Sequence, residues 1–489
     1  MPTMASFSLH SPPSHLHYHH AASFPRHFTV AFKTSYFGPK LHQKPLRISL
    51  RNRAMAAPTE PAVTTSTHTF DVVIIGAGII GLTVARQFLV GSDLSVAVVD
   101  KAAPCSGATG AGQGYLWMVH RTPGSDTWGL TLRSHQLWKM FAESVREQGL
   151  DPLEVLGWKN TGSLLVGRTR EQSMKLEKQV NRLREAGLRA ECLSSHDLPL
   201  KEPALDVGED GGAAFLPDDC QLDAHRTVAF ILKGNREFGS KGRYAEFFHD
   251  PVTGLLRSNG HGKVEAVQTS KNTLYCKKGV IVAAGCWSGS LMHDLLRGSD
   301  IVLDLPVKPR KGHLLVLENF SPFSLNHGLM EAGYVDHLPK TVDLKNYASG
   351  MADQDQNLSV SMTATMDAVG NLLLGSSRQF AGFGTDMDES TVNHIWMRAG
   401  EFFPKLKALS LGDLPKDRHV RVGLRPYMPD GKPVIGPVPA LMNVFIAAGH
   451  EGGGLSMALG TAEMVADMVL GRPELIDSTA FAVQGRFSC

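Results

Sequence analysis

The 489-residue sequence lacks any apolar run of the length that a membrane-spanning helix requires. Its six cysteines are scattered, with no Cys-x-x-Cys pair and no Cys/His ligand spacing. This pattern argues against a disulfide framework and against a zinc site. No internal repeat is visible. We therefore expect no transmembrane segment and no bound metal in a chain long enough for two sizeable lobes.

Acidic side chains are missing from residues 1–59, which carry seven Lys or Arg, seven His and many Ser. A basic, Ser-rich, acid-free composition is typical of an organelle transit peptide, which we assign to residues 1–60. Abundant Ser, His and Pro with sparse Arg favours a chloroplast over a mitochondrion, and an ordinary basic tail is the alternative. Without this segment, 42 Lys and Arg face 47 Asp and Glu, a formal charge of about −5. That balance argues against nucleic acid or an anionic membrane as the partner.

Residues 70–81 read FDVVIIGAGIIG, a dinucleotide-binding fingerprint between a predicted strand (Phe70–Ile75) and a predicted helix (Leu82–Val90). In this motif the first glycine permits a tight turn, the second lets the backbone approach a pyrophosphate, and the third lets helix pack on strand. The phosphates would lie at the helix N-terminus. A second predicted strand, Leu94–Val99, precedes Asp100, whose carboxylate can bind a ribose hydroxyl. The fingerprint does not distinguish one dinucleotide from another.

Alternating strand and helix patterns occur at the start, the centre and the end of the chain, whereas Asp304–Asp386 has a β-rich pattern. The centre includes two predicted strands, Thr273–Cys276 and Gly279–Ala283, and Pro203–Pro217 has the Pro/Gly punctuation of a crossing between lobes. We therefore predict a discontinuous nucleotide-binding domain and a substrate-binding domain. The first comprises residues 68–150, 216–300 and 416–489, and the second comprises residues 151–215 and 301–415.

Four further motifs carry chemical signals. They are CSGATGAGQG (Cys105–Gly114), GVIVAAGCWS (Gly279–Ser288), VGLRPYMPDGKPVIGP (Val422–Pro437) and VFIAAGHEGGGLSMA (Val444–Ala458). Dense small residues let the backbone lie against a ligand, although a flexible loop has the same composition. Arg425, in the third motif, can bind a carboxylate through two hydrogen bonds, and a salt bridge between lobes is the alternative. The last motif ends in a helix start, which stabilises a developing anion.

Together with the fingerprint, these motifs follow one another across nearly all of residues 70–470 and resemble the FAD-dependent D-amino-acid, glycine and sarcosine oxidase family. The resemblance implies an α/β fold of the glutathione-reductase type, with a Rossmann-like FAD-binding domain and a β-rich, α+β substrate domain. It implies FAD held non-covalently, because Gly423 stands where some members attach flavin through Cys, and the small-residue loop has no His. The cofactor-binding residues it implies are Gly76, Ala77, Gly78, Ile79, Ile80, Gly81, Asp100, Lys101, Gly107, Ala108, Thr109, Gly285, Gly449, Gly452, Gly453, Gly454 and Leu455.

The family resemblance also implies oxidation of the C–N bond of an amino acid or secondary amine. Hydride would pass from Cα to flavin N5, the imine would be hydrolysed, and electrons would pass to O2, giving H2O2. A dehydrogenase that uses a quinone or protein acceptor is one alternative, and a flavin-binding assembly factor without turnover is another. Arg425 would bind the substrate carboxylate.

Three further side chains have weaker signals. Tyr427 is a candidate for orienting the substrate, and His313 and His450 are candidate proton carriers, with structural packing as the alternative for each. Glycine-oxidase relatives carry Arg where this chain has Glu451, which counts against a simple glycine pocket. An oxidase needs a positive charge near the flavin to activate oxygen, and the sequence does not identify the residue; Lys308, Arg310 and Lys311 form a basic cluster before His313, with a solvated loop as the alternative. The oligomeric state is not predicted.

Overall fold

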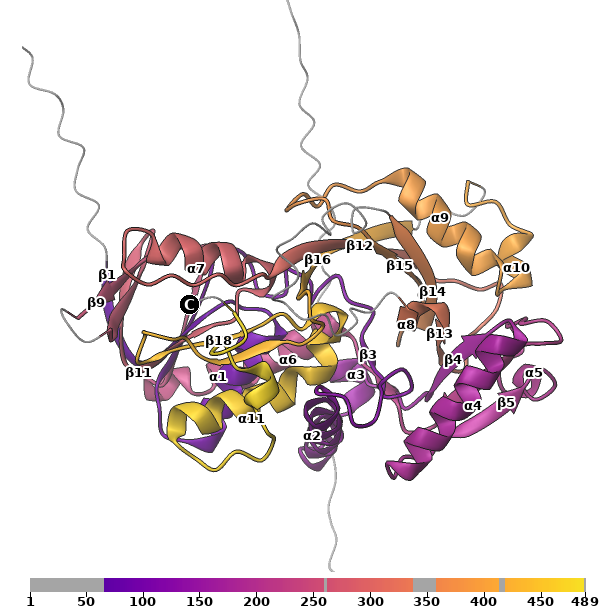
Figure 1. The fold of residues 1–489 in the computed structure, drawn as a ribbon, viewed down its shortest axis with the longest axis horizontal. Coiled ribbons are helices and arrows are strands. Elements are labelled where there is room, and N and C mark those ends of the chain that lie inside the picture. The colour runs from indigo at the N-terminus through magenta and orange to yellow at the C-terminus, as the bar shows by residue number, and fades with distance from the viewer. Residues whose placement is uncertain (1–65, 259–261, 337–357, 413–417, 488–489) are drawn as a thin grey trace, which may run out of the picture. The chain divides into compact units, whose positions relative to one another are not determined.

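The computed structural model describes residues 66–258, 262–336, 358–412 and 418–487. The predicted transit segment, residues 1–60, lies outside these ranges. The described chain folds around two eight-stranded sheets and one two-stranded sheet (Figure 1). Among these residues, no helix combines the length and the apolar character needed to cross a bilayer.

The first sheet is parallel at its centre. Its main path runs β17 (Val434–Pro437), β18 (Val444–Ala448), β11 (Asn272–Val282), β1 (Ser66–Ile75), β2 (Val96–Asp100) and β8 (Tyr244–Phe248). β17 is antiparallel to β18, and β10 (Val264–Thr269) and β9 (Val252–Arg257) continue antiparallel from β11. Alternate β1 side chains enter two separate cores, Val72 in one and Val73 in the other. The Phe70–Ile75 part of β1 is thus buried on both faces, as its mostly apolar sequence predicts, whereas residues 66–69 of the strand are exposed.

Helices cover both faces of this sheet. The core that contains Val72 also takes in side chains of α1 (Ile79–Gly91), α2 (Trp128–Glu147), α6 (Ala224–Arg236) and α11 (Gly454–Leu470). The core that contains Val73 takes in α7 (Ser288–Leu296). β1, β2, β11 and β18 all run parallel, so the turns that follow them meet at one edge of the sheet. Ligands of open parallel sheets bind at this edge.

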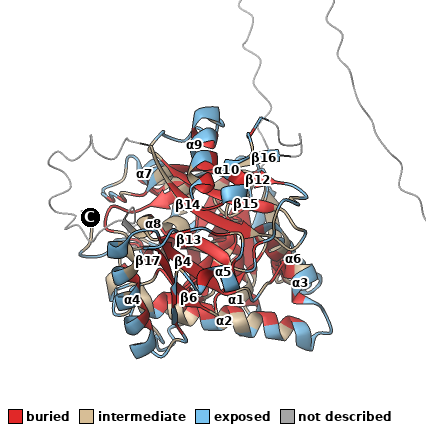
Figure 2. Ribbon diagram, turned by 90° about the vertical axis from the view of Figure 1, so that its right-hand side faces the viewer, coloured by how far each residue is buried: buried red, intermediate tan, exposed pale blue. Residues whose placement is uncertain are grey.

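The second sheet is mostly antiparallel and carries the β-rich middle of the chain. Its order is β16 (Arg418–Tyr427), β12 (Lys308–Leu317), β15 (Leu372–Arg378), β14 (Ser359–Met366), β13 (Gly328–Glu331), β4 (Ser163–Gly167), β6 (Gly212–Leu216) and β5 (Glu191–Ser194). The surrounding helices are α9 (Glu389–Gly400), α10 (Pro404–Lys407), α4 (Arg170–Glu185), α5 (Leu198–Lys201) and α8 (Gly333–Asp336). Figure 2 shows buried residues concentrated in these strands and exposed residues on helices such as α4.

Short elements join the two sheets. β3 (Tyr115–Leu116) pairs with β7 (Cys220–Gln221), and α3 (Pro152–Leu156) packs beside α6. Two 3₁₀ turns, η2 (Gly285–Trp287) and η4 (Glu451–Gly453), follow β11 and β18. β3 and both turns border the site described below.

The predicted α/β architecture with a second β-rich part is confirmed, and three details differ from the sequence expectation. The two strands expected over residues 273–283 form one strand, β11, which bulges near Cys276 rather than breaking. The punctuated block Pro203–Pro217 contains a strand of the second sheet, β6, whose five residues are all buried. β16 lies in the predicted nucleotide-binding part yet joins the second sheet, because it pairs with β12 from Lys308↔Tyr427 to Leu317↔Arg418.

Candidate active site

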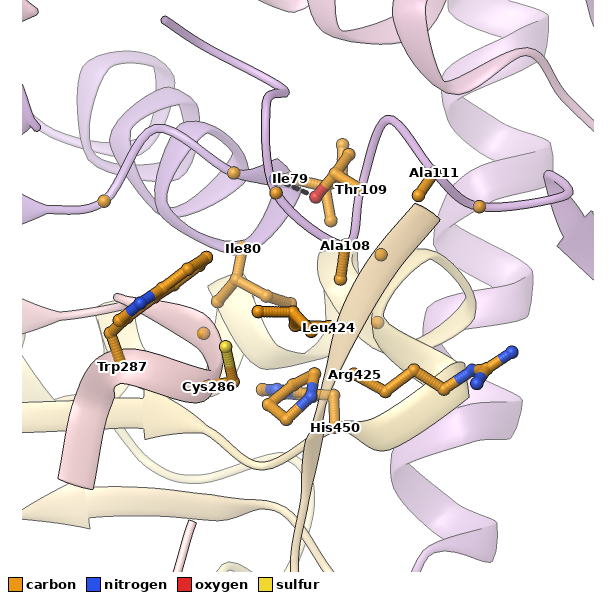
Figure 3. Close-up of a pocket in the computed structure, with 18 of the residues that line it drawn as sticks. Ile79, Ile80, Ala108, Thr109, Ala111, Cys286, Trp287, Leu424, Arg425 and His450 are labelled. Atoms are coloured by element: carbon orange, nitrogen blue, oxygen red, sulfur yellow. Dashed lines mark hydrogen bonds between the residues drawn. The ribbon is translucent and has the colours of Figure 1, made fainter. Parts of the chain in front are cut away.

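A cavity of about 700 Å³ lies along the carboxyl edge of the first sheet and extends beneath β16 and β12 of the second. Residues of the fingerprint, the small-residue loop, the turn after β11 and the turn after β18 line it together. In the close-up, Trp287 and Arg425 lie at opposite sides of this space, with Ile80 and Leu424 between them (Figure 3). Such an elongated, mostly apolar cavity is suited to a large cofactor with a substrate at one end.

The fingerprint glycines are required by close backbone contacts. Gly76 has φ +121°, and a Cβ there would lie 2.3 Å from the Ala283 carbonyl oxygen. A Cβ at Gly81 would lie 2.0 Å from the Gly76 carbonyl oxygen, so α1 packs directly on the turn. Gly78 is the N-cap of α1, which has neither a side-chain cap nor an acidic residue in its first turn. Gly78, Ile79 and Ile80 line the cavity, so a helix N-terminus suited to phosphate opens onto it.

Asp100 closes β2 and also holds the fingerprint turn. Its Oδ2 accepts a hydrogen bond from the Ala77 N–H (2.7 Å), and its Oδ1 accepts one from the Ala102 N–H (2.8 Å). Each carboxylate oxygen keeps a further lone pair, and Asp100 lines the cavity, so a ribose hydroxyl can bind there. The Lys101 Nζ lies 3.9 Å from the centre of the Trp287 ring. Trp287, which the sequence motifs did not identify as a site residue, lines the cavity near Lys101.

The small-residue loop lies against α1 and against β16. Thr109 Oγ1 accepts the Ile79 N–H (3.1 Å), and Gly107, Ala108 and Thr109 all line the cavity. A Cβ at Gly423 would lie 2.6 Å from the Ala111 Cβ, so β16 can approach this loop only without a side chain there. Gly285 has φ +57° and open space where its Cβ would be, on the opposite wall.

Two thiols in the cavity wall are poorly suited to covalent attachment of a cofactor. Cys105 and Cys286 both line the cavity and are buried. Burial raises the pKa of each thiol to about 12, which keeps the unreactive protonated form at physiological pH. No grouping of three His, Cys, Asp or Glu side chains in the described ranges could hold a metal ion.

The turn after β18 delivers a second helix N-terminus to the cavity. α11 begins without a side-chain cap and without an acidic residue in its first turn, and a Cβ at Gly454 would meet nothing within 4 Å. Gly452, Gly454 and Leu455 line the cavity, whereas Gly449 and Gly453 do not. Gly449 has φ +76° and packs against Met428, so it shapes the turn from behind.

His450 is a structural residue in this turn. Its Nε2 lies 3.0 Å from Thr461 Oγ1, and burial lowers the pKa of the ring to about 3. His313 is likewise engaged at both ring nitrogens, with Nδ1 3.0 Å from Ser377 Oγ and Nε2 accepting the Asp388 N–H (3.2 Å). Although His313 lines the cavity, its ring connects β12 to β15 through Ser377 and to the start of α9 through Asp388, which is a structural role.

Arg425 extends from β16 along the cavity wall, away from Trp287 (Figure 3). Its Nη1 donates to the Ser377 carbonyl oxygen (2.9 Å), and its other donors have no partner among the described residues. The guanidinium lies directly over Gly312 of β12, where a Cβ would be 2.2 Å from Nη1. Tyr427, expected to orient substrate, does not line the cavity and instead packs edge-on against Phe380, with ring centroids 5.0 Å apart.

Arg310 and Glu451 form an ion pair beside Arg425, with Nη1 and Oε1 3.2 Å apart. Both side chains are nearly buried, at 12% and 11% exposed. Burial raises the pKa of Glu451, but Arg425, Arg310 and Arg378 outweigh this effect and hold the pKa below its usual value. The Lys308–Lys311 segment is therefore strand β12 and not the expected solvated loop, and Lys311 is buried.

Two tyrosines complete this end of the cavity. Tyr115 of β3 and Tyr334 of α8 both line it, and their hydroxyl oxygens are 3.1 Å apart. Neither residue lies in a motif that sequence reasoning could have found. The chain continues from Tyr115 into a buried segment. There the Asp219 carboxylate accepts hydrogen bonds from the N–H groups of Met118 (2.9 Å) and Val119 (3.1 Å).

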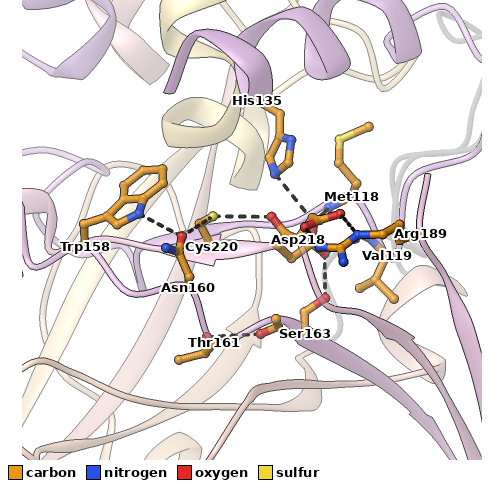
Figure 4. Close-up of polar contacts among 12 residues, drawn as sticks. Met118, Val119, His135, Trp158, Asn160, Thr161, Ser163, Arg189, Asp218 and Cys220 are labelled. Carbon is orange, nitrogen blue, oxygen red and sulfur yellow. Dashed lines mark hydrogen bonds and ion pairs between the residues drawn. The ribbon is translucent and has the colours of Figure 1, made fainter. Parts of the chain in front are cut away.

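Asp219 also accepts a hydrogen bond from the Ser163 hydroxyl (2.6 Å) and lies 3.8 Å from His135 Nε2. Figure 4 shows Met118, Val119, His135 and Ser163 together at this junction. Because Ser163 begins β4, the contact joins the second sheet to the segment behind Tyr115.

The described residues fit FAD. Two helix N-termini face the cavity, each with a glycine N-cap and no acidic residue in its first turn, although Thr109 Oγ1 accepts the first N–H of α1. Glycines without room for a Cβ form the fingerprint turn, and a strand-end carboxylate stands at one end of the cavity. Gly285 and Gly454, by contrast, leave open space in the cavity wall. The α1 terminus would hold the pyrophosphate and the α11 terminus the flavin edge on which negative charge develops.

Comparison with known proteins agrees with this reading. The model of the FAD-dependent oxidoreductase family DAO matches residues 71–468. Glycine oxidase of Pseudomonas aeruginosa is 27% identical over 430 residues, which cover 85% of this chain and 99% of the relative. Hydrogen cyanide synthase subunit HcnC of Pseudomonas protegens is 25% identical over 444 residues, covering 84% and 95%.

The crystal structure of glycine oxidase from Geobacillus kaustophilus superposes with a TM-score of 0.69 at 22% identity, covering 86% of this chain and 100% of that one. The fold is therefore that of a two-domain FAD-binding flavoprotein. With the family model matching most of the chain and the cavity fitting its cofactor, this protein belongs to the DAO family of FAD-dependent oxidoreductases.

Proposed function

We propose that the protein oxidises the C–N bond of an amino acid or a secondary amine that carries a carboxylate. The observation that carries this proposal is Arg425, a guanidinium in the wall of the cavity that fits FAD, with donors that no residue within the described ranges accepts. The names of the relatives described above include glycine oxidase, which agrees with a small amino-acid substrate.

Arg425 would bind the substrate carboxylate through its free donors, while the Ser377 carbonyl holds Nη1 in place. This positions the substrate Cα in the cavity and reduces the entropy lost on reaching the reactive geometry. FAD, when bound, would supply the acceptor for the two electrons of the substrate Cα–H bond, so that the C–N bond becomes the C=N bond of an imine. The uncapped start of α11 would stabilise the negative charge that this transfer creates. The imine product is then hydrolysed by water.

Glu451 supports a single carboxylate-binding arginine. Arg310 lies opposite Arg425 in the β12–β16 register, and two like charges so placed repel each other. The Glu451 carboxylate neutralises Arg310 through the ion pair described above. The Glu451 charge acts on Arg425 as well, but no ion pair within the described ranges joins the two side chains, so Arg425 keeps donors for the substrate. This differs from a pocket built around two arginines.

Anaerobic bleaching of the flavin tests the proposal. Purified holoprotein is mixed without oxygen with D-amino acids, glycine, N-methyl amino acids and cyclic imino acids. We expect at least one to bleach the flavin, and Arg425→Ala to raise KM for it greatly while the flavin stays bound, with Arg425→Lys intermediate. A flavin-replete Arg425→Ala with unchanged kinetics would exclude the assigned role. A yellow protein that no amine bleaches would instead favour the assembly-factor alternative.

The electron acceptor proposed is O2, reduced to H2O2. Readmission of air to the bleached protein should restore the flavin spectrum with one H2O2 for each substrate oxidised. Slow reoxidation by air and rapid reoxidation by a soluble quinone would identify the dehydrogenase alternative.

We also propose a chloroplast location, from the acid-free composition of residues 1–59. Residues 1–65 fused to a fluorescent protein should enter plastids of plant cells. A fusion found in mitochondria or in the cytosol would contradict this assignment.

A further inference from the structure

The hydroxyl groups of Tyr115 and Tyr334 meet beside Arg425. A Cβ built at Gly452 would lie 3.4 Å from the Tyr115 oxygen, 3.5 Å from the Tyr334 oxygen and 3.9 Å from Arg425 Cδ. Gly452 lines the cavity, so the two hydroxyls lie close to the side chain that would bind the substrate carboxylate. In an α-amino acid the amine is one carbon away from the carboxylate, which brings it into the same region.

Arg378 lies against Tyr334 and forms no ion pair with a carboxylate of the described residues. Its guanidinium carbon is 4.0 Å from the Tyr334 ring centroid, and the residue is only 1% exposed. Nη1 donates to Ser361 Oγ (3.0 Å), whereas Nη2 is buried and has no hydrogen-bond partner in the part of the chain that the structure describes. Among the described residues, Glu451 is a carboxylate whose charge acts on Arg378, and it acts on Arg425 and Arg310 as well. Three guanidinium groups thus share this carboxylate, so a second negative charge nearby would compensate the excess of buried positive charge.

We infer that Tyr334 is the residue that accepts a proton from the substrate's ammonium group, with its phenolate as the counter-ion of Arg378. The inference rests on the proposed function. The proton moves from the substrate nitrogen to Tyr334 Oη, leaving a neutral amine with a free lone pair and a neutral phenol. The two hydroxyl oxygens are 3.1 Å apart and either can be the donor; in this inference Tyr115 donates its O–H to the Tyr334 phenolate rather than to the more distant Gly452 carbonyl oxygen (3.4 Å), and so stabilises the phenolate before the substrate arrives. Arg378 acts through Tyr334 and is a positioning residue.

The charges around the two phenols agree with these roles. Burial raises the pKa of Tyr334, but Arg378 and Arg425 outweigh burial and the opposing Glu451, and the pKa lies below its ordinary value. Burial and the neighbouring Tyr334 raise the pKa of Tyr115, despite Arg121 and Arg425, so Tyr115 keeps its proton. His120 lies with its ring centroid 6.4 Å from that of Tyr334, and burial together with Arg121 lowers its pKa, which keeps it neutral.

The inference is tested first by titrating the tyrosines of the holoprotein without substrate, from near-UV tyrosinate difference spectra. In the wild type, one tyrosine should ionise below the ordinary range of about pH 10. Tyr334→Phe should remove this ionisation, Arg378→Met should move it to higher pH, and Arg378→Lys should largely restore it. Tyr244→Phe, at a buried tyrosine in β8 outside the cavity, is the matched control and should leave it unchanged.

The second measurement is the pH dependence of anaerobic flavin bleaching by the best amine substrate. Tyr334→Phe should lower the apparent second-order rate constant at neutral pH by about 100-fold or more, the usual contribution of a general base. In the pH–rate profile of Tyr334→Phe, the acidic limb should move to higher pH, up to the pKa of the substrate amine. The acidic limb of Arg378→Met should also move to higher pH.

The outcomes separate the two proposals. Turnover in a wild type that lacks a Tyr334-dependent ionisation would refute the role of Tyr334 and leave the proposed function intact. An unchanged acidic limb in flavin-replete Tyr334→Phe would refute it as well. If no amine bleaches the wild type, the proposed function fails, and the assignment of the proton to an amine fails with it.

Discussion

Replacing Gly312 by Ala should displace the Arg425 guanidinium and leave the rest of the cavity in place. The added Cβ would lie 2.2 Å from Arg425 Nη1 and 2.6 Å from both Cζ and Nη2, far inside van der Waals contact. The guanidinium is the flexible end of a long side chain and can move, whereas β12 is held by β15 and β16 on both sides. The clash should therefore be relieved at Arg425, with little loss of stability.

The expected decrease in kcat/KM follows from the hydrogen bonds between Arg425 and the substrate that the displacement would break. A hydrogen bond to a charged group contributes about 1.5–3 kcal/mol. Losing one such bond to the substrate carboxylate should lower kcat/KM by about 10- to 150-fold. Most of the change should appear in KM, with the flavin spectrum and the melting temperature nearly unchanged.

The assay compares Gly312→Ala, Arg425→Ala and the double variant in a thermodynamic cycle. If Gly312 acts only by making room for Arg425, the double variant should be no worse than Arg425→Ala alone. Gly279→Ala in β11 is the matched control, because its Cβ would make only ordinary contacts, with the nearest atom 3.5 Å away. Wild-type kinetics in Gly312→Ala, or full additivity in the cycle, would refute this account of the site.

Three further predictions concern the cofactor and the frame of the site. Thr109→Val should weaken FAD binding to the apoprotein by about 2- to 10-fold, because the Ile79 N–H loses its acceptor, and Thr109→Ser should retain binding in a fluorescence titration. Gly423→Ala should also weaken FAD binding, since its Cβ would lie 2.6 Å from that of Ala111, and Ala111→Gly should restore it in the double variant; failure of this rescue would contradict the packing argument. Asp219→Asn should destabilise the fold by about 1–3 kcal/mol, because an amide has one acceptor oxygen where the carboxylate uses two. Burial raises the pKa of Asp219 from 3.8 to about 7, so between these pH values the folded protein keeps a proton that the unfolded chain releases. The stability of the wild type relative to Asp219→Asn should therefore fall as the pH rises from about 4 to about 7. A stability difference that does not change with pH in thermal unfolding would exclude this ionisation.

Much of the first sheet could be predicted because its signals are local. The second part of β1, Phe70–Ile75, is a mostly apolar run buried on both faces, and the turn after it needs glycines that the next few residues supply. The second sheet was harder to predict, because its pairings are long-range. β6 lies within a block rich in Pro and Gly and still pairs with β4 and β5, since all five of its residues are buried between them. β16 follows its partner β12 by about a hundred residues, and no local pattern reveals that register.

By itself, the sequence determined the cofactor and led to the proposal that Arg425 binds the substrate carboxylate. The order of the glycine motifs resembles one flavoprotein family, the family model confirms it, and Arg425 follows from its motif. Only the tertiary structure decided what surrounds Arg425. It pairs Arg310 with Glu451, brings Tyr115 to Tyr334 across 219 positions, and lays Arg378 over the Tyr334 ring. The physical reason is that a glycine turn depends on neighbours in sequence, whereas the charge and proton affinity of a buried group depend on neighbours in space.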